Sequence, residues 1–282
     1  MIELNKKIKR TQETYGLLWE KEAATIPIAR WHFNDMQDKI NVPIVRGNTG
    51  IDIGSGCGYD AYIMAKNNPA VTILALDISD GVFKAKNLAN RLNNMSVIKG
   101  SVVDVPLKND TLDFAYSFGV LHHIPSPEQG LREIKRVLKP GSPLFIYLYE
   151  DHSENHIKHF ALEVIKIIRK ITIRIPSKLL YLLSYIVSPF VVLLFSYPAR
   201  ILDKFNITKP LAKKIPFNFG THPFSLAGDL YDRFGAPLEH RFSKNEISDL
   251  FNKTGFININ IERFDSKAGW VAWGYKSNVR YI

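Results

Sequence analysis

The run GIDIGSGCGYD, residues 50–60, constrains the fold of this chain more than any other stretch. Apolar residues up to Ile53 are followed by alternate glycines, Gly54, Gly56 and Gly58, which is typical of a buried strand that ends in a tight turn. Glycine lets the backbone approach a ligand closely, and open α/β sheets bind ligands at the carboxyl ends of their strands. The run therefore predicts a central strand followed by a ligand-binding turn.

Strand-like and helix-like stretches alternate over residues 49–150. The segments VTILALDIS, MSVIKG, TLDFAYSF and SPLFIYLYE predict further strands, and near-continuous apolar runs such as VTILALDIS are typical of parallel sheets covered on both faces. The clearest helix between them begins with Ser126 as a candidate N-cap and Pro127 at its first position. Repeated βα units predict an α/β fold, a Rossmann-like doubly wound parallel sheet.

The C-terminal part of the chain resumes this pattern. The segment SKNEISDLFNKTGF predicts a helix with a capping box formed by Ser243 and Glu246, ending at Gly255. FININIERF and GWVAWGYK then predict two strands with no helix between them. These last strands must therefore pair antiparallel or leave the sheet.

The glycine spacing excludes two common phosphate-binding loops. A dinucleotide pattern begun at Gly54 has Tyr59 where its third glycine should be, and no Gly-Lys-Ser/Thr follows. Asp52 precedes the first glycine by two residues, and a carboxylate there suits an amino group better than a phosphate. Asp77 closes the second strand, where it can accept both hydroxyls of a ribose. Asp104 follows the third strand, where it can accept from an adenine amino group.

Two apolar residues complete this predicted ligand site. Ile78 and Val105 directly follow the two acids and are predicted to enclose the adenine ring. The ligand inferred is an adenosine with free ribose hydroxyls, no phosphate and an amino group. The alternative structural roles are a helix cap for Asp77 and a turn for Asp104. Cys57, the single cysteine, is predicted to be a small loop residue, and no metal site is predicted.

These residues and their order resemble class I S-adenosylmethionine-dependent methyltransferases. The matching segments are IDIGSGCG, ALDIS, GSVVDVPLKNDTLDFAYSFGVLHHI and LREIKRVLKPGSPLFIY. The resemblance implies a seven-stranded Rossmann-like fold, binding of S-adenosyl-L-methionine and methyl transfer. It places the methionine end at Asp52, Gly54, Ser55, Gly56 and Gly58, the ribose at Asp77, the adenine at Asp104 with Val105, and the methyl donor beside Ser117 and Phe118.

A narrower resemblance covers most of the chain. TQETYGLLW, IPSKLLYLLS and LYDRFGAPLEHRFSKNEISDLFNKTGF are similar to a bacterial small-molecule methyltransferase subgroup with a long hydrophobic helical insertion. Because substrates in that subgroup are diverse, the resemblance implies a reaction and leaves the acceptor and the attacked atom open.

His122 and His123 follow the fourth strand, at the predicted mouth of the site. Methyl transfer from a sulfonium is an in-line displacement that needs positioning, and it needs a base only where the acceptor must lose a proton. Either histidine suits that role at neutral pH. The alternative is that the LHHIP segment only shapes the approach to the next helix.

Further residues are candidates for a lid over the site. Tyr15 and Trp19 lie four residues apart in a predicted helix, so one face presents both rings, either as a lid or in ordinary packing. His222 and His240 are further candidates on the lid side.

Most of the net charge of +10 belongs to residues 157–214, which carry eleven Lys or Arg and two acids. Within them, residues 179–199 hold no charge, a length that can span a bilayer, although Pro189 is expected to break a helix there. The preceding segment, residues 156–171, has one apolar and one basic helical face, as interfacial helices do. A lid buried over the acceptor, a surface that docks on a membrane or lipid, and a membrane span are the three alternatives.

These features predict four parts. They are a helical cap over residues 1–48, a cofactor-binding core over 49–150, a basic and hydrophobic helical insertion over 151–235, and a C-terminal helix with two strands over 236–282. The N-terminus lacks a secretory signal, so we expect a cytoplasmic protein, peripheral on the inner face of the membrane if the insertion docks there.

The predicted function is methyl transfer from S-adenosyl-L-methionine to a small, apolar or lipid-linked acceptor. One alternative is an RNA methyltransferase, prompted by the basic charge. It is disfavoured because SFGVLHH lacks the N/D-P-P-aromatic motif and the charge accompanies an apolar segment. Another is a non-catalytic adenosine-ligand sensor or membrane adaptor.

Overall fold

A seven-stranded sheet forms the centre of the computed structural model, with strand order β3-β2-β1-β4-β5-β7-β6. The structure describes residues 2–22, 32–212, 215, 225–264 and 269–278. The first five strands are parallel, whereas β7 is antiparallel to both β5 and β6, which confirms the Rossmann-like prediction. The strands are β1 (Thr49–Ile53), β2 (Thr72–Asp77), β3 (Met95–Lys99), β4 (Phe114–Phe118), β5 (Pro143–Tyr149), β6 (Phe256–Phe264) and β7 (Gly269–Lys276).

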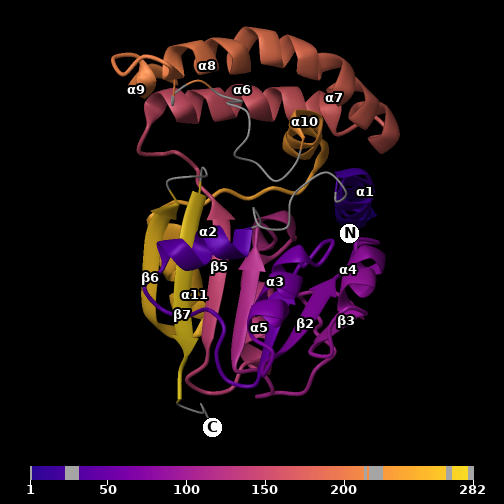
Figure 1. The fold of residues 1–282 in the computed structure, drawn as a ribbon, viewed down its shortest axis with the longest axis vertical. Helices are drawn as coiled ribbons and strands as arrows, with labels where there is room; N and C mark the ends of the chain where they lie inside the picture. The colour runs from indigo at the N-terminus through magenta and orange to yellow at the C-terminus, as the bar shows by residue number, and fades with distance from the viewer. Residues whose placement is uncertain (1, 23–31, 213–214, 216–224, 265–268, 279–282) are drawn as a thin grey trace.

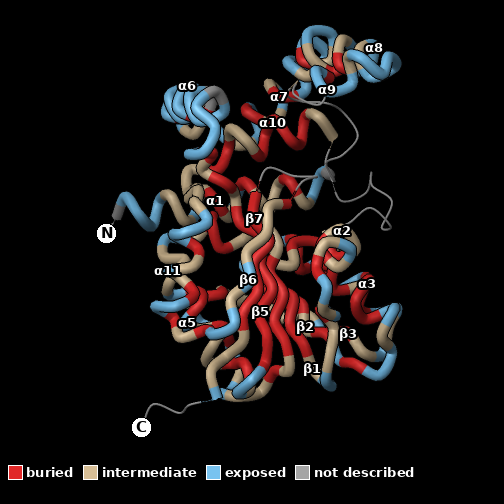
Figure 2. Tube along the Cα trace, turned by 90° about the vertical axis from the view of Figure 1, so that its left-hand side faces the viewer, coloured by how far each residue is buried: buried red, intermediate tan, exposed pale blue. Residues whose placement is uncertain are grey.

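Helices cover both faces of this sheet (Figure 1). One apolar core joins the sheet to α2 (His32–Lys39) and α3 (Tyr59–Asn67), and a second joins it to α5 (Pro127–Val137) and α11 (Lys244–Thr254). Because both faces are covered, the central strands β1, β4 and β5 are buried along most of their length (Figure 2). The other helices against this body are α1 (Ile2–Glu22), α4 (Val82–Ala89) and the short η2 (Leu121–His123).

The predicted helix ends are confirmed. The Ser126 hydroxyl accepts from the Gln129 N–H at the start of α5. At α11, Ser243 and Glu246 form both hydrogen bonds of a capping box, and Gly255 ends the helix with φ of 78°.

A second helical layer lies across the sheet edge toward which the parallel strands run (Figure 1). We call it the helical layer. It consists of α6 (His156–Thr172), α7 (Ser177–Val191), η3 (Val192–Ser196), α8 (Tyr197–Asp203), α9 (Lys209–Ala212) and α10 (Leu226–Gly235). Since the carboxyl ends of parallel strands carry the ligand sites of α/β folds, this layer covers the side where a site is expected.

The expectation that Pro189 breaks the apolar segment is wrong. Helix α7 runs through Pro189, and continues through the π-helical turn η3 into α8. Proline has no N–H to donate to the carbonyl of residue 185, one turn back. The Ser188 hydroxyl donates to that Tyr185 carbonyl instead, at 2.9 Å, so the helix continues without an unsatisfied acceptor.

Helix α1 joins the helical layer to the sheet. Leu18 packs with Leu180 of α7 and Tyr231 of α10 in a small buried cluster. The Arg10 guanidinium donates to the Ser177 hydroxyl and to the Ile175 carbonyl, just before α7. The N-terminal helix is therefore fixed to the insertion as well as to the sheet edge.

Candidate active site

The glycine turn after β1 has the conformation that its sequence predicts. Gly54, Gly56 and Gly58 all have positive φ, between 54° and 81°, which favours glycine. A Cβ built at Gly56 would lie 2.4 Å from the Trp19 ring, so α1 packs directly on the turn. Trp19 therefore packs on the turn, and its role as a lid stays a prediction.

Asp77 holds this turn in place. One of its oxygens accepts the Gly56 N–H at 2.8 Å, and the other accepts the Ser79 N–H at 2.7 Å. Each carboxylate oxygen has two lone pairs, so both oxygens can still accept a ribose hydroxyl. The geometry fits the predicted ribose contact, which stays a prediction.

Carboxyl groups are concentrated under the turn. Asp52 is buried and accepts the Ala61 N–H at 3.1 Å. Burial, together with the nearby carboxylates of Asp60 and Asp77, raises the pKa of Asp52 well above its ordinary value. A ligand that carries positive charge would relieve this repulsion, whereas a phosphate would increase it.

The residues that are predicted to bind adenine lie in different environments. Ile78 is 43% exposed and lines a cavity of about 1150 Å³ between α1 and the ends of β2 and β3. Val105 is buried in the core on the α5 side, and its N–H donates to Glu133 at 2.8 Å. Asp104 beside it is exposed. The predicted enclosure of adenine by Ile78 and Val105 stays a prediction.

Two further residues that are predicted to bind the cofactor lie at the end of β4. The Ser117 hydroxyl donates to the Ile53 carbonyl at 3.0 Å and ties β4 to β1. The Phe118 ring stacks between the rings of His32 and Tyr147, at centroid distances of 4.1 and 4.3 Å. A Cβ built at the next residue, Gly119, would meet no atom of the described residues within 4 Å, so these residues leave open space beside the aromatic stack.

His123 belongs to a buried hydrogen-bond network with α1 and α10. Its Nδ1 donates to the Leu238 carbonyl at 2.7 Å, which leaves Nε2 as an acceptor in the neutral ring. The Tyr15 hydroxyl lies 2.7 Å from that Nε2 and 2.8 Å from an Asp232 carboxylate oxygen. The Tyr149 hydroxyl approaches the other oxygen of Asp232, at 3.5 Å.

The network shares one titratable proton. Tyr15 has a single hydroxyl proton for two acceptors, so both short contacts are hydrogen bonds only when Asp232 or His123 is protonated. Burial lowers the pKa of His123 to about 4. Burial, opposed by the Tyr15 hydrogen bond and reinforced by Asp229 and Glu239, raises the pKa of Asp232 to about 6. The proton therefore resides on Asp232 below about pH 6, and above it the network holds a buried carboxylate.

His122 differs sharply from its neighbour. Its ring is fully buried, stacks on Tyr149 at 3.8 Å, and neither ring nitrogen has a hydrogen-bond partner among the described residues. Burial, together with the charges near it, lowers its pKa well below the ordinary value, so the ring is neutral. An unpartnered buried polar group costs about 1–3 kcal/mol, and a ligand that bonds to this ring would recover that cost.

The other two residues predicted on the lid side are His240 and His222. His240 is held by backbone: its N–H donates to the His122 carbonyl at 2.8 Å, and its Nε2 donates to the Ile124 carbonyl at 3.0 Å. It fastens the segment after α10 to the histidine turn. His222 lies outside the described residues.

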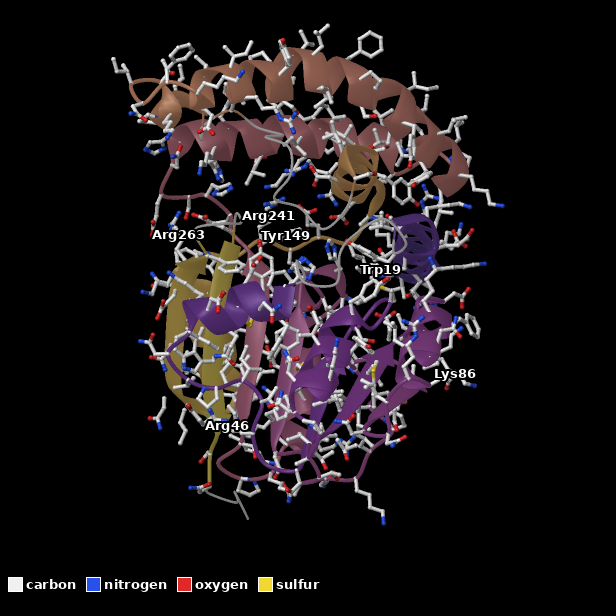
Figure 3. All side chains as sticks on the ribbon, viewed as in Figure 1. Trp19, Arg46, Lys86, Tyr149, Arg241 and Arg263 are labelled. Carbon is white, nitrogen blue, oxygen red and sulfur yellow. The ribbon has the colours of Figure 1, made fainter. Side chains whose placement is uncertain are left out.

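Three site residues were not predicted from the sequence: Asp232, Tyr149 and Glu239. Glu239 is buried between two guanidinium groups, contacting Arg169 and lying 2.7 Å from Arg241. Despite burial, those arginines lower the pKa of Glu239. Tyr149 and Arg241 lie with Trp19 in the band between sheet and helical layer (Figure 3). Only the position of Tyr149 at the end of β5 could have indicated it in advance.

Comparison with known proteins supports the resemblance. Residues 51–146 match a family described as a methyltransferase domain. A tRNA (carboxymethyluridine(34)-5-O)-methyltransferase of Saccharomyces cerevisiae is 35% identical over 106 residues, 36% of each chain. A 2-methyl-6-phytyl-1,4-hydroquinone methyltransferase of Oryza sativa is 31% identical over 38% of this chain and 33% of its own. The chain thus spans about a third of the length of these relatives.

Solved structures share the fold over most of the chain. A Haloferax volcanii protein solved with the Trm112 methyltransferase activator has a TM-score of 0.55, at 15% identity, over 96% of this chain and 100% of its own. Human N-acetylserotonin methyltransferase, solved in complex with S-adenosylmethionine, has a TM-score of 0.50, at 13% identity, over 87% and 51%. The family match identifies residues 51–146 as a methyltransferase domain, and the chain has the Rossmann-like fold of class I S-adenosylmethionine-dependent methyltransferases.

Proposed function

We propose that the protein transfers a methyl group from S-adenosyl-L-methionine to a small, apolar acceptor. The observation that carries this proposal is the pair of carboxylates, Asp52 and Asp77, placed at the glycine turn. When bound, the cofactor supplies a methyl group activated on a positively charged sulfonium, and it also carries an ammonium group. A cation bound beside these carboxyl groups would favour their ionised form, and Asp77 retains free lone pairs for the ribose.

The buried network supplies proton removal. A hydroxyl or amine acceptor must lose its proton as its oxygen or nitrogen forms the new bond to the methyl group. In the proposed mechanism, that proton passes to the Tyr15 and His123 pair and finally to the Asp232 carboxylate. Asp232 can receive it only above about pH 6, where the carboxylate is ionised.

Aromatic side chains favour an apolar acceptor. Phe118, Tyr147, Tyr149 and the neutral His122 gather at the ends of β4 and β5, beside the open space at Gly119. Their rings bind an apolar body, while the His122 nitrogens, which have no partner in the part of the chain that the structure describes, are available to one polar group on it. The phytyl hydroquinone in the name of the Oryza relative and the sterol in that of a yeast relative, sterol 24-C-methyltransferase, are acceptors of this class.

Transfer to tRNA is the second candidate, because one relative is named for that activity. The helical layer argues against it. Its exposed face consists mainly of large aliphatic side chains rather than an aromatic platform in a basic groove, on which bases would stack. Incubation with labelled cofactor and either total tRNA or a lipid extract separates the two candidates directly.

The four parts predicted from the sequence then have distinct roles. Residues 49–150 bind the cofactor, residues 1–48 cover it, residues 151–235 select the acceptor, and residues 236–282 complete the sheet.

Calorimetric titration tests the cofactor assignment. Asp77→Ala should weaken binding of S-adenosyl-L-methionine on the order of tenfold or more, since charged hydrogen bonds to the ribose are lost. Because Asp77 also holds the glycine turn, a cofactor analogue lacking the 2′-hydroxyl provides the decisive comparison. It should bind more weakly than the cofactor to the natural protein, but equally to the variant. Equal affinities in the natural protein would reject the ribose contact.

Two controls complete this test. Asp249→Ala removes an exposed carboxylate on α11 and should leave the affinity unchanged. NAD and ATP should not displace the cofactor, because the turn lacks the dinucleotide spacing and Asp52 disfavours phosphate. Displacement by either nucleotide at comparable concentration would contradict the proposed site.

A further inference from the structure

The long apolar helix of the helical layer exposes most of its large apolar side chains, the reverse of an ordinary amphipathic helix in a water-soluble protein. The most apolar 18-residue window within Ser177–Asp203 has a mean hydropathy of 2.2, and only 22% of that window is buried. Its buried positions include small or polar residues such as Ser184, Ser196 and Ala199. Its exposed positions hold the large apolar side chains: Leu179, Leu182, Tyr185, Ile186, Val187, Phe190, Leu193, Leu194, Tyr197 and Ile201.

Helix α6 is arranged in the same way. It directs Leu162 and the Arg169 guanidinium inward, where Arg169 pairs with the buried Glu239. Its exposed positions include five large apolar residues: Phe160, Val164, Ile167, Ile168 and Ile171. Seen end-on, α6 and α8 stand apart on the side of the molecule away from the sheet, and both are largely exposed (Figure 2). Neither helix therefore hides the apolar face of the other.

The cost of this exposure in water is large. Each fully exposed Leu, Ile or Phe side chain forgoes roughly 1.5–3 kcal/mol of hydrophobic stabilisation. Soluble monomers rarely expose continuous apolar patches of this kind, and those that do use them for binding. A lid buried over the acceptor does not account for these side chains, because each of them is between 41% and 71% exposed.

Charge identifies what covers this face. Exposed basic residues accompany the apolar side chains along α6 and from α7 to α9, whereas acids are nearly absent from these helices. The exposed basic residues are Lys158, Lys166, Lys170, Arg174, Lys178, Arg200, Lys204 and Lys209. A second copy of the same surface would repel it, and an aqueous anion would leave the apolar face uncovered. An anionic bilayer satisfies both features together.

We propose that the outward faces of α6, α7, η3, α8 and α9 dock on an anionic lipid bilayer as an in-plane, interfacial surface. The helix does not span the bilayer in this arrangement. Its inner side is fixed to the protein by Leu180, which packs on Leu18 and Tyr231. A spanning helix would have to abandon that cluster and place Ser184 and Ser196 in hydrocarbon.

This docking would bring the sheet edge with the candidate active site toward the lipid. The helical layer lies directly over that edge, with Tyr149, Arg241 and Trp19 beneath it (Figure 3). The proposal concerns the surface alone and is measured without methyl donor or acceptor. Its failure would therefore leave the proposed methyl transfer untouched.

Cosedimentation with vesicles tests the charge requirement. The natural protein should bind vesicles of phosphatidylcholine with phosphatidylglycerol, and bind pure phosphatidylcholine much more weakly. Each basic residue near an anionic leaflet contributes about fivefold in binding, so Lys204→Glu with Lys209→Glu should reduce it about 25-fold or more. The matched control reverses two exposed lysines on the sheet body, Lys86→Glu with Lys253→Glu, and should change binding less than twofold. Equal loss in both pairs would overturn the proposal.

The apolar contact needs its own variant. Leu193→Gln with Leu194→Gln alters two side chains that are each 65% exposed, so folding should be unaffected while vesicle binding falls about tenfold or more. Ile257→Gln, on β6 and 44% exposed, is the control. If the leucine pair instead converts a dimer into a monomer with unchanged vesicle binding, the occupant is a second copy and the proposal is wrong.

Depth measurement separates docking from spanning. The single cysteine, Cys57, is buried, so Phe190→Cys can be labelled selectively with an environment-sensitive fluorophore. Lipids with quenchers near the headgroup should quench it more strongly than lipids with quenchers at the chain ends. Strongest quenching from the chain ends would show a span, and no quenching by either would show that the face does not meet lipid.

Discussion

Replacing Asp232 by asparagine should change stability in a way that depends on pH. Burial raises the pKa of Asp232 from 3.8 to about 6, so the folded protein holds this proton more tightly than the unfolded chain does. The resulting stabilisation is fully present below about pH 4 and is lost as the pH rises through about 6. The difference between the two pKa values corresponds to about 3 kcal/mol. Asparagine keeps an oxygen for Tyr15 and can donate toward Tyr149, but it never carries the buried charge.

Urea unfolding at two pH values measures this effect. Between pH 4.5 and pH 7.5, the natural protein should lose about 2 kcal/mol of unfolding free energy that Asp232→Asn does not lose. Relative to the natural protein, the variant should therefore gain about that amount at the higher pH. Asp249→Asn, an exposed carboxyl on α11, controls for the removal of any acid. The same stability difference between Asp232→Asn and the natural protein at both pH values would refute the buried-charge argument.

Three further predictions concern other features of the site and fold. Tyr15→Phe should lower the rate of methyl transfer to a hydroxyl or amine acceptor about 100-fold while cofactor affinity changes little, because only the proton network is interrupted. An unchanged rate in a steady-state assay would remove Tyr15 from the mechanism. Gly56→Val should weaken cofactor binding about tenfold or more in calorimetry, because its side chain meets Trp19 and its backbone φ is 54°; undiminished affinity would show that the turn tolerates both. Ser243→Ala should lower the free energy of unfolding by about 1 kcal/mol in urea, and a change under 0.3 kcal/mol would mean that the capping box contributes nothing.

Local chemistry made the sheet and its helix ends predictable. The apolar runs of β1 and β2, the N-cap at Ser126 and the capping box at Ser243 each depend on residues a few positions apart. The glycine turn and the acid at the end of β2 were predictable for the same reason.

The proton network was not predictable, because its members are distant in the chain. Tyr15 and Asp232 are 217 positions apart, and they meet only because α1 and α10 both pack at the sheet edge. The sequence also could not distinguish His122 from His123. The two rings differ in their hydrogen bonds to residues distant in the chain, which no local pattern predicts. The prediction that Pro189 breaks the helix was wrong for a local reason, because the hydroxyl of the neighbouring serine replaces the missing hydrogen bond.

The position of α1 has a consequence for the order of binding events. On this one helix, Trp19 covers the glycine turn, Tyr15 completes the proton network and Arg10 contacts the insertion. A helix moves largely as a rigid body, so a cofactor that displaces Trp19 also shifts Tyr15. The free energies of binding cofactor and acceptor are then coupled through α1, and thermodynamic linkage requires each ligand to change the affinity for the other by the same factor.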